Sequence, residues 1–183
     1  MRKKIILCFI AIFSFLTLTL FGCGETAPIE NFYGSYALSS VHCNYYDGDV
    51  FRNMTYINPT RDICLGSAEQ NEFYRDVYDM LGTYLRFEKE YIYFNEKIPV
   101  TYTCSKIFDD GAFRFEFDNI FGTQSGDVTK YMNDGYASVS LDYKDNTVKE
   151  RHISITSSLF VKGQGPLDFK PVATLKFAFS NLT

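Results

Sequence analysis

The chain has 183 residues, of which 18 are basic and 22 acidic, so that it carries a net charge of −4. A mildly acidic chain without a basic stripe is a poor ligand for phosphate backbones, and we therefore exclude nucleic acid as a partner. Phe and Tyr are abundant, with 18 and 14 copies, whereas Trp is absent, and this composition favours a β-rich core.

The first 22 residues have the pattern of an export signal. Residues 2–4 are all basic, and an uncharged stretch rich in Ile, Leu and Phe runs from Ile5 to Gly22. As a helix this stretch would be about 27 Å long, so a retained membrane anchor is the alternative. Because no basic cluster follows the stretch, a cleaved signal is the better interpretation.

Leu20-Phe21-Gly22-Cys23 resembles the lipobox of bacterial lipoproteins, in which Leu, a variable residue and a small residue precede the cysteine. The resemblance implies cleavage before Cys23 and a diacylglyceryl group on its sulfur, with a further acyl chain such as palmitate on the amine. Two chains are needed for stable anchoring. We therefore expect a signal peptide at 1–22 and a lipidated tether at 23–31. The expected location is the cell membrane or outer membrane, on its periplasmic or cell-surface side.

The segment near 33–42 predicts the first strand of a β domain, since Tyr36, Leu38 and Ser40 alternate with small residues along it. Phe32-Tyr33-Gly34-Ser35-Tyr36-Ala37-Leu38-Ser39-Ser40-Val41 resembles the opening strand of bacterial lipocalin-like domains, where a Gly-x-Trp core starts an up-and-down barrel. Gly34 and Tyr36 stand at the two motif positions, with Tyr in place of Trp. The resemblance implies one lipocalin-like domain over 32–183 that holds a small apolar ligand.

A long polar loop is expected from residue 43 to about 66, followed by one α-helix over about 68–81. Ser67 and Gln70 have the spacing of a capping box, and Gly82 is a stop signal. The apolar residues of the helix recur at helical spacing, so this face is expected to pack on the core. They are Phe73, Val77, Met80 and Leu81.

The rest of the chain predicts strands that alternate between apolar and polar residues. Asp109-Asp110-Gly111 and Lys144-Asp145-Asn146 are turn signals between them. We expect a mainly β fold, an antiparallel up-and-down barrel of about eight strands that closes and so removes its exposed edges. The further strands are expected at 84–87, 91–94, 100–108, 113–117, 137–143, through 153–155 and through 175–179.

A barrel of about eight strands has an interior that side chains are just able to fill. Bulky residues are expected to point into it, so a packed core and a ligand pocket both stay open as interpretations. The inward candidates are Phe113, Phe115, Phe117, Leu141, Phe177 and Phe179.

Three cysteines follow Cys23, an odd number for an exported domain. They permit one disulfide, for which Cys43 and Cys64 are the candidates, or three buried thiols including Cys104. Their spacing with the two histidines matches no zinc pattern, and we expect neither a metal nor a cofactor. No nucleophile motif accompanies either histidine, so we do not expect an enzyme.

A second resemblance covers part of the strand region. Val100-Thr101-Tyr102-Thr103-Cys104, with Asp110-Gly111 and Phe113–Asp118 after it, is similar to the start of bacterial lipoprotein inhibitors of c-type lysozyme. Those proteins insert a Ser-Gly loop into the lysozyme cleft, and Ser125-Gly126 with Lys130-Tyr131 is similar to that loop.

Together these patterns predict a monomeric, membrane-anchored extracytoplasmic binding lipoprotein. Its expected partners are membrane lipid through Cys23 and a small apolar ligand or a protein. The alternatives are a hydrolase inhibitor, of lysozyme or a protease, that acts through the segments 43–66 or 122–135, and a structural envelope lipoprotein without a ligand.

Overall fold

The computed structural model describes residues 29–96, 98–108, 111–121, 124–125, 127–142, 147–163 and 169–182. The predicted signal peptide 1–22 and Cys23 lie outside the described residues, as do the turn signals at 109–110 and 144–146. In the described part of the chain, no helix is both long and apolar enough to cross a membrane.

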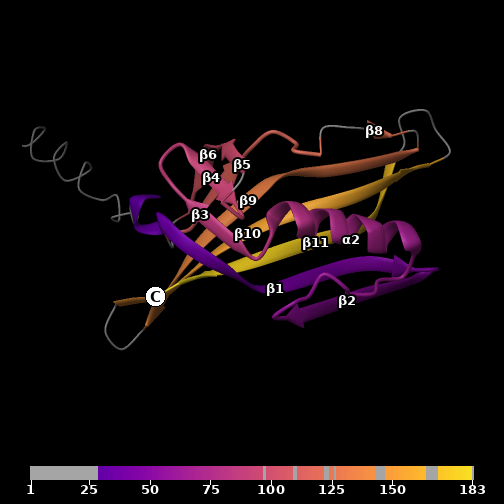
Figure 1. The fold of residues 1–183 in the computed structure, drawn as a ribbon, viewed down its shortest axis with the longest axis horizontal. Coiled ribbons are helices and arrows are strands. Elements are labelled where there is room, and N and C mark those ends of the chain that lie inside the picture. Colours follow the sequence, from indigo (N-terminus) through magenta and orange to yellow (C-terminus); the bar gives the residue numbers. More distant parts are fainter. Residues whose placement is uncertain are drawn as a thin grey trace, which may run out of the picture.

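One antiparallel sheet forms almost the whole structure (Figure 1). It comprises β1 (Gly34–Asp47), β2 (Val50–Ile57), β3 (Tyr84–Phe87), β4 (Tyr91–Phe94), β5 (Ile98–Thr101), β6 (Thr103–Ile107), β7 (Phe113–Glu116), β8 (Gln124–Ser125), β9 (Val128–Asp142), β10 (Thr147–Lys162) and β11 (Phe169–Asn181). Nine of these strands follow one another in the order β5-β4-β3-β1-β11-β10-β9-β7-β6, while β2 pairs with β1 and β8 with β9. A 3-10 turn, η1 (Ile29–Phe32), precedes β1, and the one helix among the described residues is α2 (Ala68–Leu81).

The sheet curls until its two ends are joined by a single stretch of chain. β5 pairs with β4 and β6 pairs with β7, yet only Tyr102 separates β5 from β6. The expected strand 100–108 is therefore two segments that belong to opposite ends of the sheet. The fold is a nearly closed antiparallel barrel with one helix, and the expected fold class is confirmed.

Long strands on one side of the barrel extend beyond the short ones. β1, β9, β10 and β11 have 13 to 16 residues each, whereas β3 to β7 have four or five. Register shifts interrupt β1 at Leu38/Ser40 and β10 at Thr156/Ser158, and such bulges bend a strand. In Figure 1 the helix α2 lies along these long strands, beyond the small strands of the barrel.

The helix begins and ends where its sequence predicts. The Ser67 side chain accepts the Gln70 N–H at 3.2 Å, and Gln70 Oε1 accepts the Ser67 N–H at 3.0 Å, which completes the capping box. Gln70 is also buried, and its Nε2 donates to the carbonyl oxygens of Tyr46 and Val172. One side chain thus caps α2 and ties it to β1 and β11.

Aromatic rings fill the barrel interior. Phe113, Phe115 and Phe117 point inward from one wall, and Phe177 and Phe179 from the other, each 5% exposed or less. The Phe87 ring lies 5.6 Å from Phe115 and 6.0 Å from Phe113, while Phe32 meets Phe113 edge-on at 4.7 Å. A fully buried Phe stabilises a fold by about 1.5–3 kcal/mol. Among the described residues these rings belong to one packed hydrophobic core.

Gly135 is required by a close approach inside this core. It lies opposite Phe115 in the β7–β9 ladder, and a Cβ at this position would lie 1.9 Å from the Phe115 ring. Only a residue without a side chain lets the ring lie on the backbone of β9. The glycine thus makes room for one of the largest core residues.

The segment 43–66 differs from the expected loop. β1 continues to Asp47, a two-residue turn follows, and β2 runs back to Ile57, so the loop prediction was wrong for 43–57. Gly48 adopts a φ of 60° at the first turn position, as hairpins of this length require. Both faces of β2 are largely exposed, so its polar residues resemble those of a loop. Similarly, the expected loop at 122–135 gives way to β9 from Val128 onward.

Candidate functional site

The two residues of the lipocalin-like motif have structural roles. Gly34 has a φ of 145°, which glycine adopts readily and other residues avoid. Tyr36 is 1% exposed, and its hydroxyl donates to the Phe32 carbonyl oxygen. Burial raises the pKa of this hydroxyl to about 12. Both residues therefore build the start of the barrel and leave no group free for a ligand.

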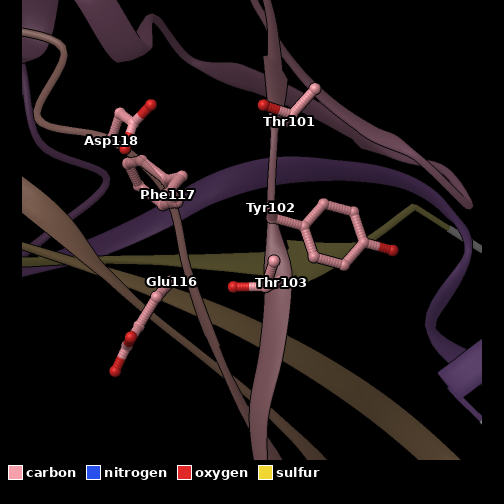
Figure 2. Close-up of a pocket in the computed structure, with 6 residues that line it drawn as sticks. All are labelled: Thr101, Tyr102, Thr103, Glu116, Phe117 and Asp118. Carbon is pink, nitrogen blue, oxygen red and sulfur yellow. The ribbon is translucent and has the colours of Figure 1, made fainter.

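A surface cleft lies where the barrel closes (Figure 2). Thr103 pairs with Glu116, but beyond this point β5 turns away to pair with β4, so the two strands separate. The resulting cleft has a volume of about 310 Å³. Its walls are Thr101, Tyr102 and Thr103 on one side and Glu116, Phe117 and Asp118 on the other.

This cleft, which we call the seam cleft, is acidic on one wall. Figure 2 shows the carboxylates of Glu116, the last residue of β7, and of Asp118, two residues further on, along one wall of the cleft, while the Tyr102 ring points away from them. The Tyr102 hydroxyl donates to the carbonyl oxygens of Glu88 and Lys89 at 2.8 and 3.0 Å, and burial raises its pKa. Within the described residues no group of three or more His, Cys, Asp or Glu is arranged to hold a metal ion. The cleft therefore supports no reaction that we can assign.

The three cysteines that the structure describes, Cys43, Cys64 and Cys104, are unbridged. Cys43 is buried in β1, and burial raises the pKa of its thiol to about 12, whereas Cys64 and Cys104 are exposed. Burial first, and then the neighbouring Tyr45 and the thiols of Cys43 and Cys64, raise the pKa of the Tyr56 hydroxyl. Both thiols thus lie near one tyrosine, and the Cys43–Cys64 disulfide stays a prediction.

The segments that resemble lysozyme inhibitors are partly brought together. Cys104 of β6 pairs with Phe115 of β7, so the two strands are neighbours. Lys130, however, belongs to the long strand β9 and forms an ion pair with Asp76 of α2. Because this lysine is held against the helix, it does not protrude as a cleft-binding residue would. Gly126 lies outside the described residues.

Exposed apolar side chains gather on the β1–β2 hairpin. Of the eight large hydrophobic residues that are exposed in the described part of the chain, five belong to this hairpin. We call these five the hairpin surface, and they are Tyr46, Val50, Phe51, Met54 and Ile57. Ile57 is 70% exposed and Phe51 is 54% exposed, whereas the one exposed ring outside the hairpin among the described residues is that of Tyr131.

The hairpin that carries this surface is well defined. Its eight residue pairs run from Asp47↔Val50 to Ser40↔Ile57 without a register shift. The Tyr46 and Phe51 rings meet at 5.5 Å across the two strands, and His42 Nδ1 lies 2.9 Å from the Thr55 hydroxyl. The apolar side chains are therefore presented on a regular two-stranded ribbon.

Sequence reasoning had placed an interaction site within 43–66 but not the residues that form it. Burial depends on the order of strands in the sheet, which the local pattern does not contain. The one available signal was Asp47-Gly48-Asp49 between Tyr46 and Val50, since Asp-Gly flanked by apolar residues favours a hairpin.

No known protein family matches the chain, and neither a curated protein nor a solved structure is similar to it. The likenesses to lipocalin-like domains and lysozyme inhibitors therefore stay expectations from the sequence. The function has to be argued from the geometry of this chain alone.

Proposed function

We propose that the chain is a lipid-anchored, extracytoplasmic lipoprotein whose β domain binds a protein partner through the hairpin surface. The observation that carries this proposal is the concentration of exposed apolar side chains on the β1–β2 hairpin. Tyr46, Phe51 and Ile57 lie on one face of this ribbon, and Val50 and Met54 lie on the other. Single exposed hydrophobic residues are common on protein surfaces, but a cluster of them on one hairpin is a feature of interaction sites.

The composition of the hairpin favours a protein partner. Protein interfaces are enriched in aromatic residues, Met and Arg, and the hairpin carries Tyr46 and Phe51 on one face and Arg52 and Met54 on the other. Acidic residues flank its turn, at Asp47 and Asp49, and they would be repelled by anionic lipid headgroups. A protein surface therefore suits the hairpin better than the membrane does.

The packed barrel argues against a small apolar ligand as the primary partner. The side chains that would line a barrel cavity are in contact with one another, as Phe87, Phe113 and Phe115 illustrate. A ligand could enter only by displacing buried aromatic rings, each of which contributes about 1.5–3 kcal/mol to the fold. Binding at the hairpin requires no such change.

The lipobox resemblance supports a site close to the membrane. If Cys23 is lipidated, only residues 24–28 separate it from η1. Five extended residues span at most about 18 Å, so the domain would work near the membrane surface. We expect Cys23→Ala to leave the precursor uncut, and an immunoblot that shows normal processing of this variant would contradict the anchor.

A site-specific photo-crosslinker tests the binding surface. The full chain is expressed in a bacterium with a benzophenone amino acid in place of Phe51 and, as the matched control, in place of Ile107. Ile107 is equally exposed, at 56% against 54%, but lies on β6, away from the hairpin surface. We expect a discrete adduct from position 51 and none from position 107. No adduct at position 51, or the same pattern from both positions, would contradict the proposal.

A further inference from the structure

β2 has a free edge along its whole length. Among the described residues it pairs with β1 and with no other strand, and Figure 1 shows it at the border of the sheet. Proteins protect such edges with proline, charges, bulges or short strands. β2 has eight residues, no proline, no register shift and one charged residue, Arg52.

The free edge offers a regular set of backbone groups. In a hairpin with a two-residue turn, the flanking residues form a hydrogen-bonded pair and the bonding then alternates along the ladder. The even-numbered residues of β2 therefore bond to β1, in agreement with the Asn58 N–H donating to the Ser39 carbonyl oxygen at 2.9 Å. The odd-numbered residues direct their N–H and C=O groups outward, and these are Phe51, Asn53, Thr55 and Ile57.

A second antiparallel β2 strand complements this edge in one register. When a two-fold axis passes through Met54, odd-numbered residues lie opposite odd-numbered ones, as the outward backbone groups require. Phe51 then lies opposite Ile57 of the second copy, and Met54 lies opposite its own equivalent. Asn53 lies opposite Thr55 of the second copy, within reach of a side-chain hydrogen bond.

Charge also fits this register. Arg52, the only charged residue of β2, lies opposite Tyr56 of the second copy, where a guanidinium–ring contact replaces a repulsion between two arginines. A register centred on Asn53 instead places Phe51 opposite Thr55 and leaves Ile57 without a partner. Among the registers that the backbone allows, the one centred on Met54 therefore pairs the exposed apolar residues best.

We propose that the partner of the hairpin surface is a second copy of this chain, joined by antiparallel pairing of the two β2 strands about Met54. The inference rests on the proposed function and names its partner. Two barrels would share one continuous sheet, with main-chain bonds supplying affinity and the facing side chains supplying specificity. Antiparallel pairing places the two η1 ends far apart, so a dimer on one membrane would lie along its surface.

Cysteine crosslinking tests the register directly. Across a non-hydrogen-bonded antiparallel pair the Cα atoms are about 4.5 Å apart, which a disulfide can span. The full chain carries Met54→Cys together with Cys64→Ser and Cys104→Ser, since those two native thiols are exposed. After mild oxidation in cells, a non-reducing gel should show a species of twice the monomer mass.

Arg52→Cys in the same background is the matched control. In the proposed register its two copies are separated by about 13 Å along the strands, too far for a disulfide. We expect on the order of tenfold more dimer from Met54→Cys than from Arg52→Cys. Crosslinking that is strongest at Asn53→Cys or Thr55→Cys would overturn the proposal.

Proline at the edge provides a second measurement. Asn53→Pro removes an outward N–H without removing a bond to β1, and an edge strand tolerates this. We expect it to abolish the Met54→Cys crosslink, whereas Asn53→Ala retains it; equal crosslinking in both would overturn the proposal. If no Met54→Cys dimer forms while the crosslinker at position 51 captures a different protein, the second copy is wrong and the proposed function stands.

Discussion

Among the described residues the sheet has one open edge along the β5–β6 segment and another along β2, and only the edge of β2 offers a site. The β5–β6 strand is interrupted at Tyr102, contains Pro99 and Lys106, and has a register shift between Cys104 and Lys106. β2 has twice the length of β5 and none of these interruptions. Exposure alone therefore does not distinguish a binding edge. The distinguishing features are its length, its regularity and its apolar side chains.

The two edges also differ in what lies beside them. The β5–β6 strand closes the barrel, and the seam cleft at its break is lined by the carboxylates of Glu116 and Asp118. β2 lies outside the nearly closed ring of strands, and of its residues only Tyr56 packs, half-buried, against the core. Substitutions in the barrel should consequently lower the free energy of unfolding. Substitutions in the hairpin should instead weaken association and leave the free energy of unfolding nearly unchanged.

The largest expected difference compares two phenylalanines. Phe115→Ala removes a ring that is completely buried, and we expect the free energy of unfolding to fall by about 3–5 kcal/mol. Phe51→Ala removes an exposed ring and should change stability by no more than about 0.5 kcal/mol. Urea unfolding of the two variants provides the comparison, and a similar loss in both would contradict the division between barrel and hairpin.

Gly135→Ala should have the next largest effect. The added methyl group meets the Phe115 ring, and overpacking of this kind costs about 1–3 kcal/mol. If the clash is the cause, the double variant with Phe115→Ala should be more stable than the sum of the two single losses predicts. Strict additivity in this double-mutant cycle would show that the close approach is not responsible.

Alkaline pH should weaken the barrel by a smaller amount. Burial raises the pKa of Tyr36 from 10.0, and that of the Cys43 thiol from 9.0, to about 12. The folded pKa exceeds the unfolded one, so folding favours the neutral forms. Their stabilisation is complete below about pH 9 and is lost as the pH rises toward 12. We expect the urea midpoint to decrease over this interval, and a constant midpoint would contradict the buried state of these groups.

The smallest effect is expected within the hairpin itself. Arg52 lies 3.4 Å from Asp47, with both side chains about half exposed, and such surface ion pairs contribute about 0–1 kcal/mol. Arg52→Ala should therefore leave the melting temperature nearly unchanged. A marked loss of stability would mean that the hairpin supports the barrel after all.

Local signals predicted the helix and several strands well. The capping box at Ser67 and Gln70 defines α2 with neighbouring residues alone, and the expected strands 84–87 and 91–94 match β3 and β4. Alternation sufficed there because one face of each strand packs on the core. These elements are determined by residues that are close in sequence.

Features that depend on distant residues escaped prediction. The need for a glycine at position 135 arises from its register with Phe115, twenty positions earlier in the chain. The second role of Gln70 depends on Val172, which is even more remote. The hairpin surface was missed for the same reason, since only the sheet order shows that, in the described part of the chain, no strand pairs with the outer side of β2.

Hydrogen exchange of the full chain, expressed in a bacterium, tests the central claim most directly. The edge amides of Phe51, Asn53, Thr55 and Ile57 have no partner strand within the chain among the described residues, just as the outer edge of β6 has none. If β2 is the binding edge, these four amides should exchange slowly while those at the edge of β6 exchange fast, and Asn53→Pro should remove the difference. Equally fast exchange at both edges would contradict the account.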